Sequence, residues 1–343
     1  MENLGKLFAY VLERQRNENF FKVRGAANNL YIGSKAIVDP VVFNSIEQCL
    51  TEHAVSGWKS RDWLDQFESY YSEWLSASKN NKIKGLNNFK PSFSTGTTQS
   101  FDSFYIRHRK KKFKCLVGEY FYHLKSWISN SFDWEFVRSV SDLKSGDALV
   151  ISNPFCDTGN TPVQFKEILD HCELHNIPVL IDSCYFSIAA GVELDLNYDC
   201  IDTVAFGLSK TFTVANLRIG IRYTKPSIAD GQTLHSDINY NHSLSACVGV
   251  HLMKSFAADF IYNSYREKQS EVCSDLGISP SQTVMFASGD AAWSTYNRAT
   301  MLKEYQLDLD PALFNNRICL NSFYENWDLY KKFRNHNENK NAV

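Results

Sequence analysis

Short apolar runs alternate with segments of helical periodicity through the middle of the chain. Five runs rich in apolar residues predict strands, at 113–117, 148–152, 179–182, 203–206 and 219–223. Between two of them, residues 163–174 place Phe165, Ile168, Leu169 and Cys172 on one helical face. This alternation predicts an α/β fold with right-handed crossovers and a mostly parallel central sheet flanked by helices. Ligands of such sheets bind beyond the carboxyl ends of the strands.

The pattern changes after the fifth predicted strand. Residues 227–245 are polar and lack clear periodicity, so we expect the chain to leave the large lobe there for a smaller one. Near the end, residues 316–320 predict a short strand, and a helix follows through Trp327 and Tyr330. The resulting division is an N-terminal segment (1–45) that packs on the small domain, a large domain (46–226) and a small α+β C-terminal domain (227–343).

Composition narrows the classes of function. The 343 residues are 44% hydrophobic and 22% charged, with a formal net charge of -2, which gives no general attraction to nucleic acid or to an anionic membrane. The basic run at 107–112 is typical of a solvated loop or helix end. Nine scattered cysteines without a Cys-x-x-Cys pair predict reduced thiols and a cytoplasmic location. The apolar run at 7–12 is too short to span a bilayer.

Lys210 is the first candidate for chemistry. It follows the predicted strand at 203–206, and Arg218 follows eight residues later, just before the next strand. A lysine at a strand end can lie in a partly desolvated cleft, where its pKa falls and its amine becomes a usable nucleophile. A solvated surface lysine is the alternative.

Three other segments also lie at predicted element ends. Asp182 ends an apolar strand and Tyr185 follows; this aspartate could bind a metal, cap a helix or pair with a protonated heterocycle nitrogen. Residues 94–100 (Ser-Thr-Gly-Thr-Thr-Gln-Ser) open a helix-like segment, where N–H groups and hydroxyls can bind a phosphate. The loop at 153–160 follows a strand with turn residues. Together, an anion cradle, a strand-end aspartate and a strand-end lysine suit pyridoxal 5′-phosphate (PLP), which carries a phosphate, a pyridinium nitrogen and an aldehyde.

The order of these motifs resembles the fold-type I PLP enzymes, specifically the class I/II aminotransferases. Ser-x-Lys-x7-Arg-x-Gly is matched by Ser209, Lys210, Arg218 and Gly220. Asp-x-x-Tyr is matched by Asp182 and Tyr185, and Asn-Pro-x-x-x-Thr-Gly by Asn153, Pro154, Thr158 and Gly159. The resemblance runs from about residue 30 to residue 333.

The resemblance implies a role for each matched residue. Lys210 would form the Schiff base and then move the α-proton, Asp182 would keep the ring nitrogen protonated, and Tyr185 would bind the phenolic oxygen. The remaining residues implied to contact the cofactor are Gly96, Thr97, Thr98 and Arg218 at the phosphate, Tyr120 stacked on the ring, and Asn153, Cys156 and Ser209. Those implied to contact substrate are Arg317, at the α-carboxylate, with Tyr31 and Gly33 from the N-terminal entry segment.

Two departures from the family pattern bear on function. The loop asparagine that usually touches the ring oxygen is Cys156 here, and Asp157 stands in place of a proline. The hydroxyl residue often found three before the lysine is Gly207, so one phosphate ligand is missing. These changes favour a divergent member that acts on an unusual amino acid, or one that directs the substrate carbanion to a reaction other than transamination.

The leading hypothesis is transamination of an L-amino acid with a 2-oxo acid by a homodimer. A PLP-dependent lyase, cyclase or decarboxylase that tailors an amino acid is the alternative, because the same lysine and aspartate serve both. A non-catalytic binding protein on the same fold is the third hypothesis.

Overall fold

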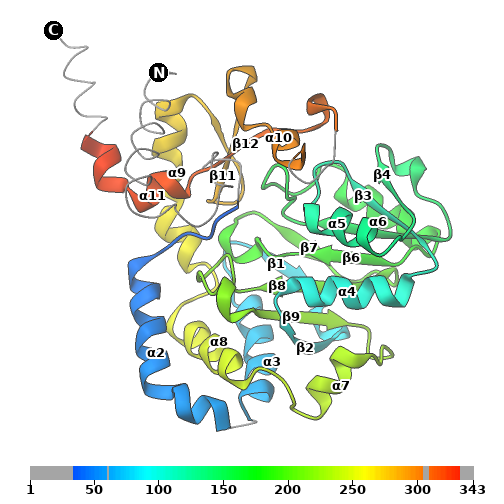
Figure 1. The fold of residues 1–343 in the computed structure, drawn as a ribbon, viewed down its shortest axis with the longest axis horizontal. Coiled ribbons are helices and arrows are strands. Elements are labelled where there is room, and N and C mark those ends of the chain that lie inside the picture. The colour runs from blue at the N-terminus through cyan, green and yellow to red at the C-terminus, as the bar shows by residue number, and fades with distance from the viewer. Residues whose placement is uncertain (1–33, 60–61, 304–308, 333–343) are drawn as a thin grey trace.

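A seven-stranded sheet forms the centre of the molecule (Figure 1). The structure, a computed structural model, describes residues 34–59, 62–303 and 309–332. In spatial order the strands are β2 (Lys90–Thr95), β9 (Ile219–Thr224), β8 (Ile201–Gly207), β6 (Val179–Asp182), β5 (Asp147–Ser152), β3 (Lys112–Leu116) and β4 (Trp134–Val137). Neighbours from β8 to β4 pair in parallel, while β9 is antiparallel to both β8 and β2. The predicted α/β fold with a mostly parallel sheet is confirmed.

All five predicted strands are present, with ends shifted by at most two residues. β2 and β4 were not predicted, because neither carries a continuous apolar run: β2 reads Lys-Pro-Ser-Phe-Ser-Thr, and β4 is a four-residue edge strand. The predicted helix at 163–174 is α6 (Phe165–Leu174), and its four predicted core residues are all buried.

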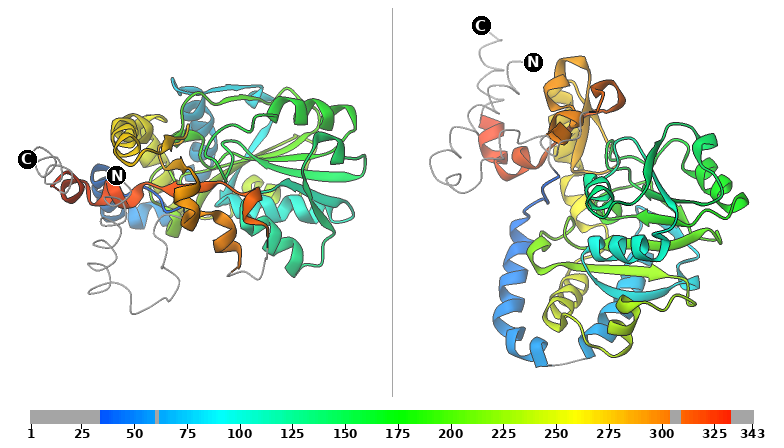
Figure 2. Two further views of the ribbon diagram at one scale, coloured as in Figure 1. Left: turned by 90° about the horizontal axis from the view of Figure 1, so that it is seen from above. Right: turned by 45° about the vertical axis from the view of Figure 1, so that its right-hand side comes forward.

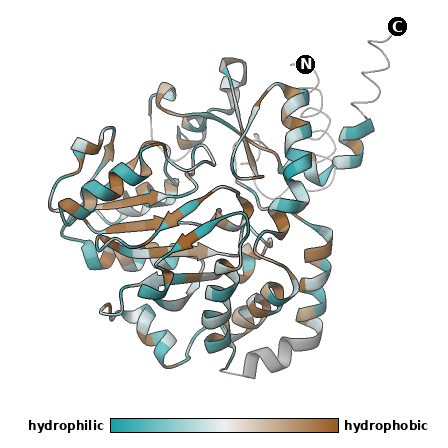
Figure 3. Ribbon diagram, turned by 180° about the vertical axis from the view of Figure 1, so that it is seen from behind, coloured by the Kyte–Doolittle hydropathy of each residue, from teal (hydrophilic) through white to brown (hydrophobic). Residues whose placement is uncertain are grey.

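Both faces of the sheet are covered by helices. Along β5, Leu149 and Ile151 contact one apolar cluster while Ala148 and Val150 contact another, because successive strand side chains point to opposite faces. The second cluster is formed with α4 (Thr97–His108) and α5 (Phe121–Ser129). The first includes residues of α2 (Pro40–Lys59), α3 (Asp62–Ser76), α6, α8 (Ser243–Ser255) and α9 (Phe260–Leu276). Brown, hydrophobic stretches mark strands of the central sheet in Figure 3.

The C-terminal part carries a second, antiparallel sheet of β10 (Ser279–Pro280), β11 (Phe286–Gly289) and β12 (Asn316–Cys319). It lies beside the large sheet, together with α10 (Arg298–Lys303) and α11 (Asn321–Glu325) (Figure 2). The predicted strand at 316–320 is β12, and helix follows it. A short parallel pair, β1 (Lys82–Lys84) with β7 (Glu193–Asp195), completes the strands of the described chain.

The division at residue 227 stays a prediction. α7 (Gly231–Asp237) contacts β2 and α4, and α8 packs on α2 and α3, so the segment directly after 227 lies against the large sheet's layers. The three-stranded sheet begins only after α9.

Three residues of the basic run at 107–112 pair with acidic side chains: Arg107, His108 and Lys112. Arg107 donates to Asp202 at 2.5 Å and to Asp230 at 2.6 Å, and His108 lies 3.1 Å from Asp202. Burial would raise the pKa of Asp202, but hydrogen bonds from His108 and the charge of Arg107 together lower it to about 2. Arg107 and His108 therefore fix the end of α4, while Arg109 and Lys110 are exposed.

In the part of the chain that the structure describes, no single helix is long and apolar enough to cross a membrane. By length and composition alone, the pair of α8 and α9, bent by 66°, passes that test. All nine cysteines are free and eight are buried, as predicted for reduced thiols.

Candidate functional site

A cavity of about 130 Å³ lies at the carboxyl ends of β6 and β8, where the fold predicts a ligand. Ten of the predicted cofactor residues line it: Gly96, Thr97, Thr98, Tyr120, Cys156, Asp182, Tyr185, Ser209, Lys210 and Arg218. Four further residues line it that the sequence did not single out as ligands: Ser34, Cys184, Gly207 and Ala215. The tertiary structure thus brings together segments that lie far apart in sequence.

Lys210 enters the cavity from the turn after β8. Its Nζ donates to the carbonyl oxygen of Ser34 and lies 3.2 Å from the Ser34 hydroxyl. Burial lowers the pKa of Lys210, because a cleft with little water disfavours the ammonium form. A lysine with a lowered pKa is a better nucleophile and base at neutral pH, which is the property that the sequence hypothesis requires.

Asp182 is the last residue of β6 and is only 2% exposed. Its carboxylate accepts a hydrogen bond from the backbone N–H of Cys184 at 3.1 Å. Burial, and then the nearby charge of Glu119, raises the pKa of Asp182 to about 7. Among the described residues no cluster of three or more His, Cys, Asp or Glu side chains could hold a metal ion, so the metal alternative for Asp182 has no support there.

An anion cradle forms where β2 turns into α4. Gly96 is the N-cap of α4, with φ 75°, so the first N–H groups of the helix are open to a ligand. Arg218 reaches the same place from the other side, and its Nη2 donates to the Thr98 hydroxyl at 2.8 Å. A Cβ on Gly96 would lie 2.3 Å from Nη2 of Arg218, so the guanidinium can lie here only because residue 96 is glycine.

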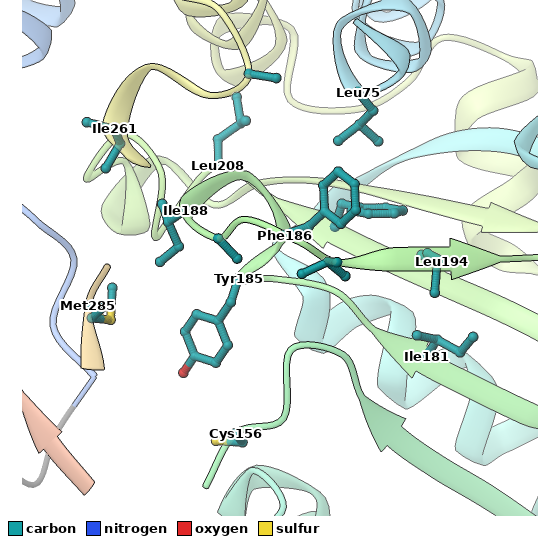
Figure 4. Close-up of a cluster of buried hydrophobic side chains, with 14 of the residues drawn as sticks. Leu75, Cys156, Ile181, Tyr185, Phe186, Ile188, Leu194, Leu208, Ile261 and Met285 are labelled. Carbon is teal, nitrogen blue, oxygen red and sulfur yellow. The ribbon is translucent and has the colours of Figure 1, made fainter. Parts of the chain in front are cut away.

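Two tyrosines complete the cavity wall. Tyr120 precedes α5, and burial raises its pKa to about 12, so its hydroxyl stays neutral. Tyr185 follows β6 and is 3% exposed; burial raises its pKa as well. Figure 4 shows the Tyr185 ring extending from the loop after β6 toward the side where Cys156 lies.

Other predicted ligands lie elsewhere. Asn153 is fully buried, accepts from the Thr161 hydroxyl at 3.0 Å and does not line the cavity. Arg317 is 2% exposed, donates to the carbonyl oxygen of Cys156 and stacks 4.2 Å from the Phe286 ring centre. It too lies outside the cavity lining, so its role at a substrate carboxylate stays a prediction. Tyr31 and Gly33, which were also predicted to contact substrate, lie outside the residues that the structure describes.

Two buried residues near the cavity were missed. Glu119, beside Tyr120, accepts from Ser152 N and Tyr120 N at 2.8 and 3.0 Å. His123 bonds to the Tyr105 hydroxyl, and burial lowers its pKa to about 3, so it is neutral. Glu119 could have been found from the sequence, since it lies next to the predicted stacking aromatic, Tyr120, after a strand. Nothing in the sequence around His123 indicates a place near the cavity.

Comparison with known proteins agrees with the fold and the motifs. The model of the family described as aminotransferase class I and II matches residues 117–268. This part of the chain, somewhat less than half of its length, is similar to that family. The match spans the loop after β3 through α9, and so includes Asp182, Lys210 and Arg218. No curated protein matches in direct sequence comparison.

Solved structures of low sequence identity share the fold of this chain. Histidinol-phosphate aminotransferase from Clostridium acetobutylicum has a TM-score of 0.58 at 13% identity, over 90% of this chain and 99% of that one. Aromatic aminotransferase from Pyrococcus horikoshii OT3 has 0.59 at 13%, over 91% and 96%. The PLP-bound C-S lyase from Staphylococcus hominis has 0.59 at 11%, over 92% and 95%.

The residues that line the cavity fit PLP. The glycine at position 96 leaves room for a phosphate ligand set of Arg218, Thr98 and the α4 N-terminus. A protonated pyridine nitrogen would supply the positive charge that the buried Asp182 carboxyl lacks. Lys210 presents an amine of lowered pKa to the same cavity.

Proposed function

We propose that the protein is a PLP-dependent enzyme that transaminates an L-amino acid with a 2-oxo acid. One observation carries this proposal: Lys210, Asp182 and the cradle of Gly96, Thr98 and Arg218 line a single cavity. Each suits a different part of PLP: the lysine amine suits the aldehyde, the aspartate suits the ring nitrogen, and the cradle suits the phosphate.

When bound, PLP supplies an electron sink for the charge that develops at the substrate α-carbon. Lys210 would take the α-proton and return it, because its lowered pKa leaves more of the amine unprotonated and able to accept a proton. Asp182 would hold a proton on the ring nitrogen, and the Tyr185 hydroxyl would donate a hydrogen bond into the cavity. Arg218 and Thr98 would bind the phosphate and so fix the cofactor's register.

A PLP-dependent lyase is the second candidate. Two observations favour it: the fold is shared with a C-S lyase, and Cys156 replaces the asparagine that the family usually places at the ring oxygen. A thiol is a weak hydrogen-bond partner, so the ring oxygen would be held less firmly than in an ordinary aminotransferase.

We further propose a homodimer located in the cytoplasm. Nine free thiols suit a reducing compartment, and the exposed Arg218 side chain leaves the phosphate end of the cavity open to a second subunit. Light scattering coupled to size exclusion would test the dimer; a monomer at micromolar concentration would contradict it.

The deciding experiment is a visible absorption scan of the purified protein with PLP, in wild type and in Lys210→Ala. We expect a visible band that survives dialysis in wild type and is lost in the variant. A panel of amino acids is then added. Accumulation of pyridoxamine 5′-phosphate supports transamination, whereas release of ammonia or carbon dioxide without it supports the lyase or decarboxylase. A wild type without the band contradicts enzyme function and favours a binding protein on this fold.

A further inference from the structure

A buried ion pair lies behind the cavity wall and links distant parts of the chain. Arg298, in α10, is 1% exposed, and its Nη1 lies 3.1 Å from Oδ1 of Asp157, which is equally buried. The same guanidinium donates to the carbonyl oxygens of Gly118 and, at 3.3 Å, Glu119. The second carboxylate oxygen of Asp157 accepts from the backbone and side-chain nitrogens of Asn315, at 2.9 and 2.7 Å.

Each partner of Arg298 adjoins a residue of the cavity wall. The carbonyl groups of Gly118 and Glu119 directly precede Tyr120, and Asp157 directly follows Cys156. The guanidinium therefore joins the loop that carries the aromatic side chain to the loop that carries the thiol.

The Glu119 side chain joins these loops a second time. Its carboxylate accepts from the Ser152 hydroxyl at 2.5 Å, and that hydroxyl in turn accepts from the backbone N–H of Cys156 at 2.9 Å. Glu119 also accepts from Tyr120 N. Glu119, Asp157 and Arg298 thus form one buried polar network with two carboxyl groups and one guanidinium.

Packing at Gly118 leaves the two loops little freedom. Gly118 has φ 94°, and a Cβ there would lie 2.6 Å from Cβ of Asp157, so the loops are in close contact. Ala299, Leu302 and Phe314 form an apolar cluster against the flanking residues at 117 and 121. The segment around α10 therefore holds the Tyr120 loop by both polar and apolar contacts.

We infer that Arg298 is a positioning residue for the cofactor ring, which acts by holding Tyr120 and Cys156 in place in the cavity wall that Asp182 also lines. This inference rests on the proposed PLP function. An arginine suits this role because one planar fork can bind two carbonyl oxygens and a carboxylate at once, and because its charge offsets those of buried Glu119 and Asp157. Neither Arg298 nor Asp157 lines the cavity, so both act through the residues they hold.

The test compares PLP dissociation constants, by absorption titration, and the visible circular dichroism of the bound cofactor. Arg298→Met should weaken PLP binding by about tenfold or more and change the dichroism, because an uncompensated buried carboxylate shifts both loops. Arg298→Lys should recover part of the affinity. Adding Asp157→Asn to Arg298→Met should restore PLP binding relative to Arg298→Met alone, because it removes the carboxylate charge that the first substitution leaves unpaired.

Arg222→Met is the matched control. Arg222 is fully buried and pairs with Asp230 at 2.7 and 2.9 Å, but it does not line the cavity. It should lower thermal stability and leave PLP affinity within about twofold of wild type. Equal weakening by both arginine variants would mean that lost stability alone explains the effect, and would overturn the inference.

The outcomes separate this inference from the proposed function. A wild type that binds no PLP overturns both. A wild type that binds PLP, with an Arg298→Met variant of unchanged affinity and dichroism, overturns the positioning role alone. If Arg298→Met does not fold, Asp157→Asn is the second variant: weaker PLP binding supports the inference, and wild-type affinity and dichroism contradict it.

Discussion

Restoring a hydroxyl at position 207 should tighten PLP binding. Gly207 is the last residue of β8 and lines the cavity beside the phosphate cradle. A Cβ built there would lie 3.5 Å from Cγ2 of Thr97 and 3.6 Å from the carbonyl oxygen of Ile219, which are ordinary contacts. Gly207→Ser therefore adds a hydroxyl without a clash, in a family position that often carries one.

The expected gain follows from one hydrogen bond to a charged group. Such bonds contribute about 1.5–3 kcal/mol net. Since about 1.4 kcal/mol corresponds to a tenfold change, the dissociation constant for PLP should fall roughly 10- to 100-fold. Absorption titration of the apoprotein with PLP measures it, and a parallel titration with pyridoxal, which lacks the phosphate, should show no gain.

Two glycine variants serve as controls. Gly207→Ala adds the same Cβ without the hydroxyl and should leave the affinity unchanged. Gly96→Ala should weaken PLP binding, because its Cβ would meet Arg218 at 2.3 Å and its φ of 75° costs a non-glycine residue roughly 1–3 kcal/mol. If Gly207→Ser binds PLP no better than Gly207→Ala, the phosphate does not lie against β8 and the assignment of the cradle is wrong.

Three further predictions concern pH, the ring oxygen and packing. The pKa of Asp182 is raised to about 7 in the folded apoprotein, against about 3.9 in the unfolded chain, so the folded state binds the proton more tightly. The contribution of this proton to the free energy of unfolding is therefore complete below about pH 4 and is lost as the pH rises to about 7. Urea unfolding of the apoprotein at pH 5, 6 and 7 should show this loss of stability, and the Asp182→Asn variant should lack it. If the free energy of unfolding falls with pH equally in wild type and variant, the raised pKa does not belong to Asp182. Cys156→Asn should strengthen PLP binding by a few fold, because an amide replaces a weak thiol partner; unchanged absorption and affinity would place the ring oxygen elsewhere. Gly249→Ala in α8 should destabilise the fold by about 1–3 kcal/mol in urea unfolding, because its Cβ would lie 2.5 Å from the Phe67 ring. A variant as stable as wild type would show that Phe67 and α3 can shift to make room at little cost.

Much of the fold could be predicted because its strands are short apolar runs separated by helical periodicity. Leu149 and Ile151 face one helical layer and Ala148 and Val150 the other, so β5 reads as a continuous apolar run. β2 was not predicted because Phe93 is its one large apolar side chain and because it contains Pro91. Its place beside β9 depends on antiparallel pairing across more than a hundred residues, which local pattern does not reveal.

The residues of the candidate site could be predicted from the sequence for a related reason. Asp182, Lys210 and the turn at Gly96 lie at strand or helix ends, and in a parallel sheet those ends meet at one edge. Properties that depend on tertiary contacts could not be predicted from the sequence. The pKa of Asp182 is set by burial and by Glu119, and the Asn153 side chain accepts a hydrogen bond from Thr161 and does not line the cavity.

The sequence by itself determined the order of elements and the residues available for chemistry, because both follow from local periodicity and from motif spacing. Only the tertiary structure decided which groups support them. Arg298 and Asp157 lie 141 residues apart; Asp157 is a variable position of the loop motif, and Arg298 stands in no motif. Their pairing exists because α10 packs on the loop after β3, and burial then requires each charge to find a partner. Long-range packing, which no local pattern encodes, therefore determines how firmly the cavity wall is held.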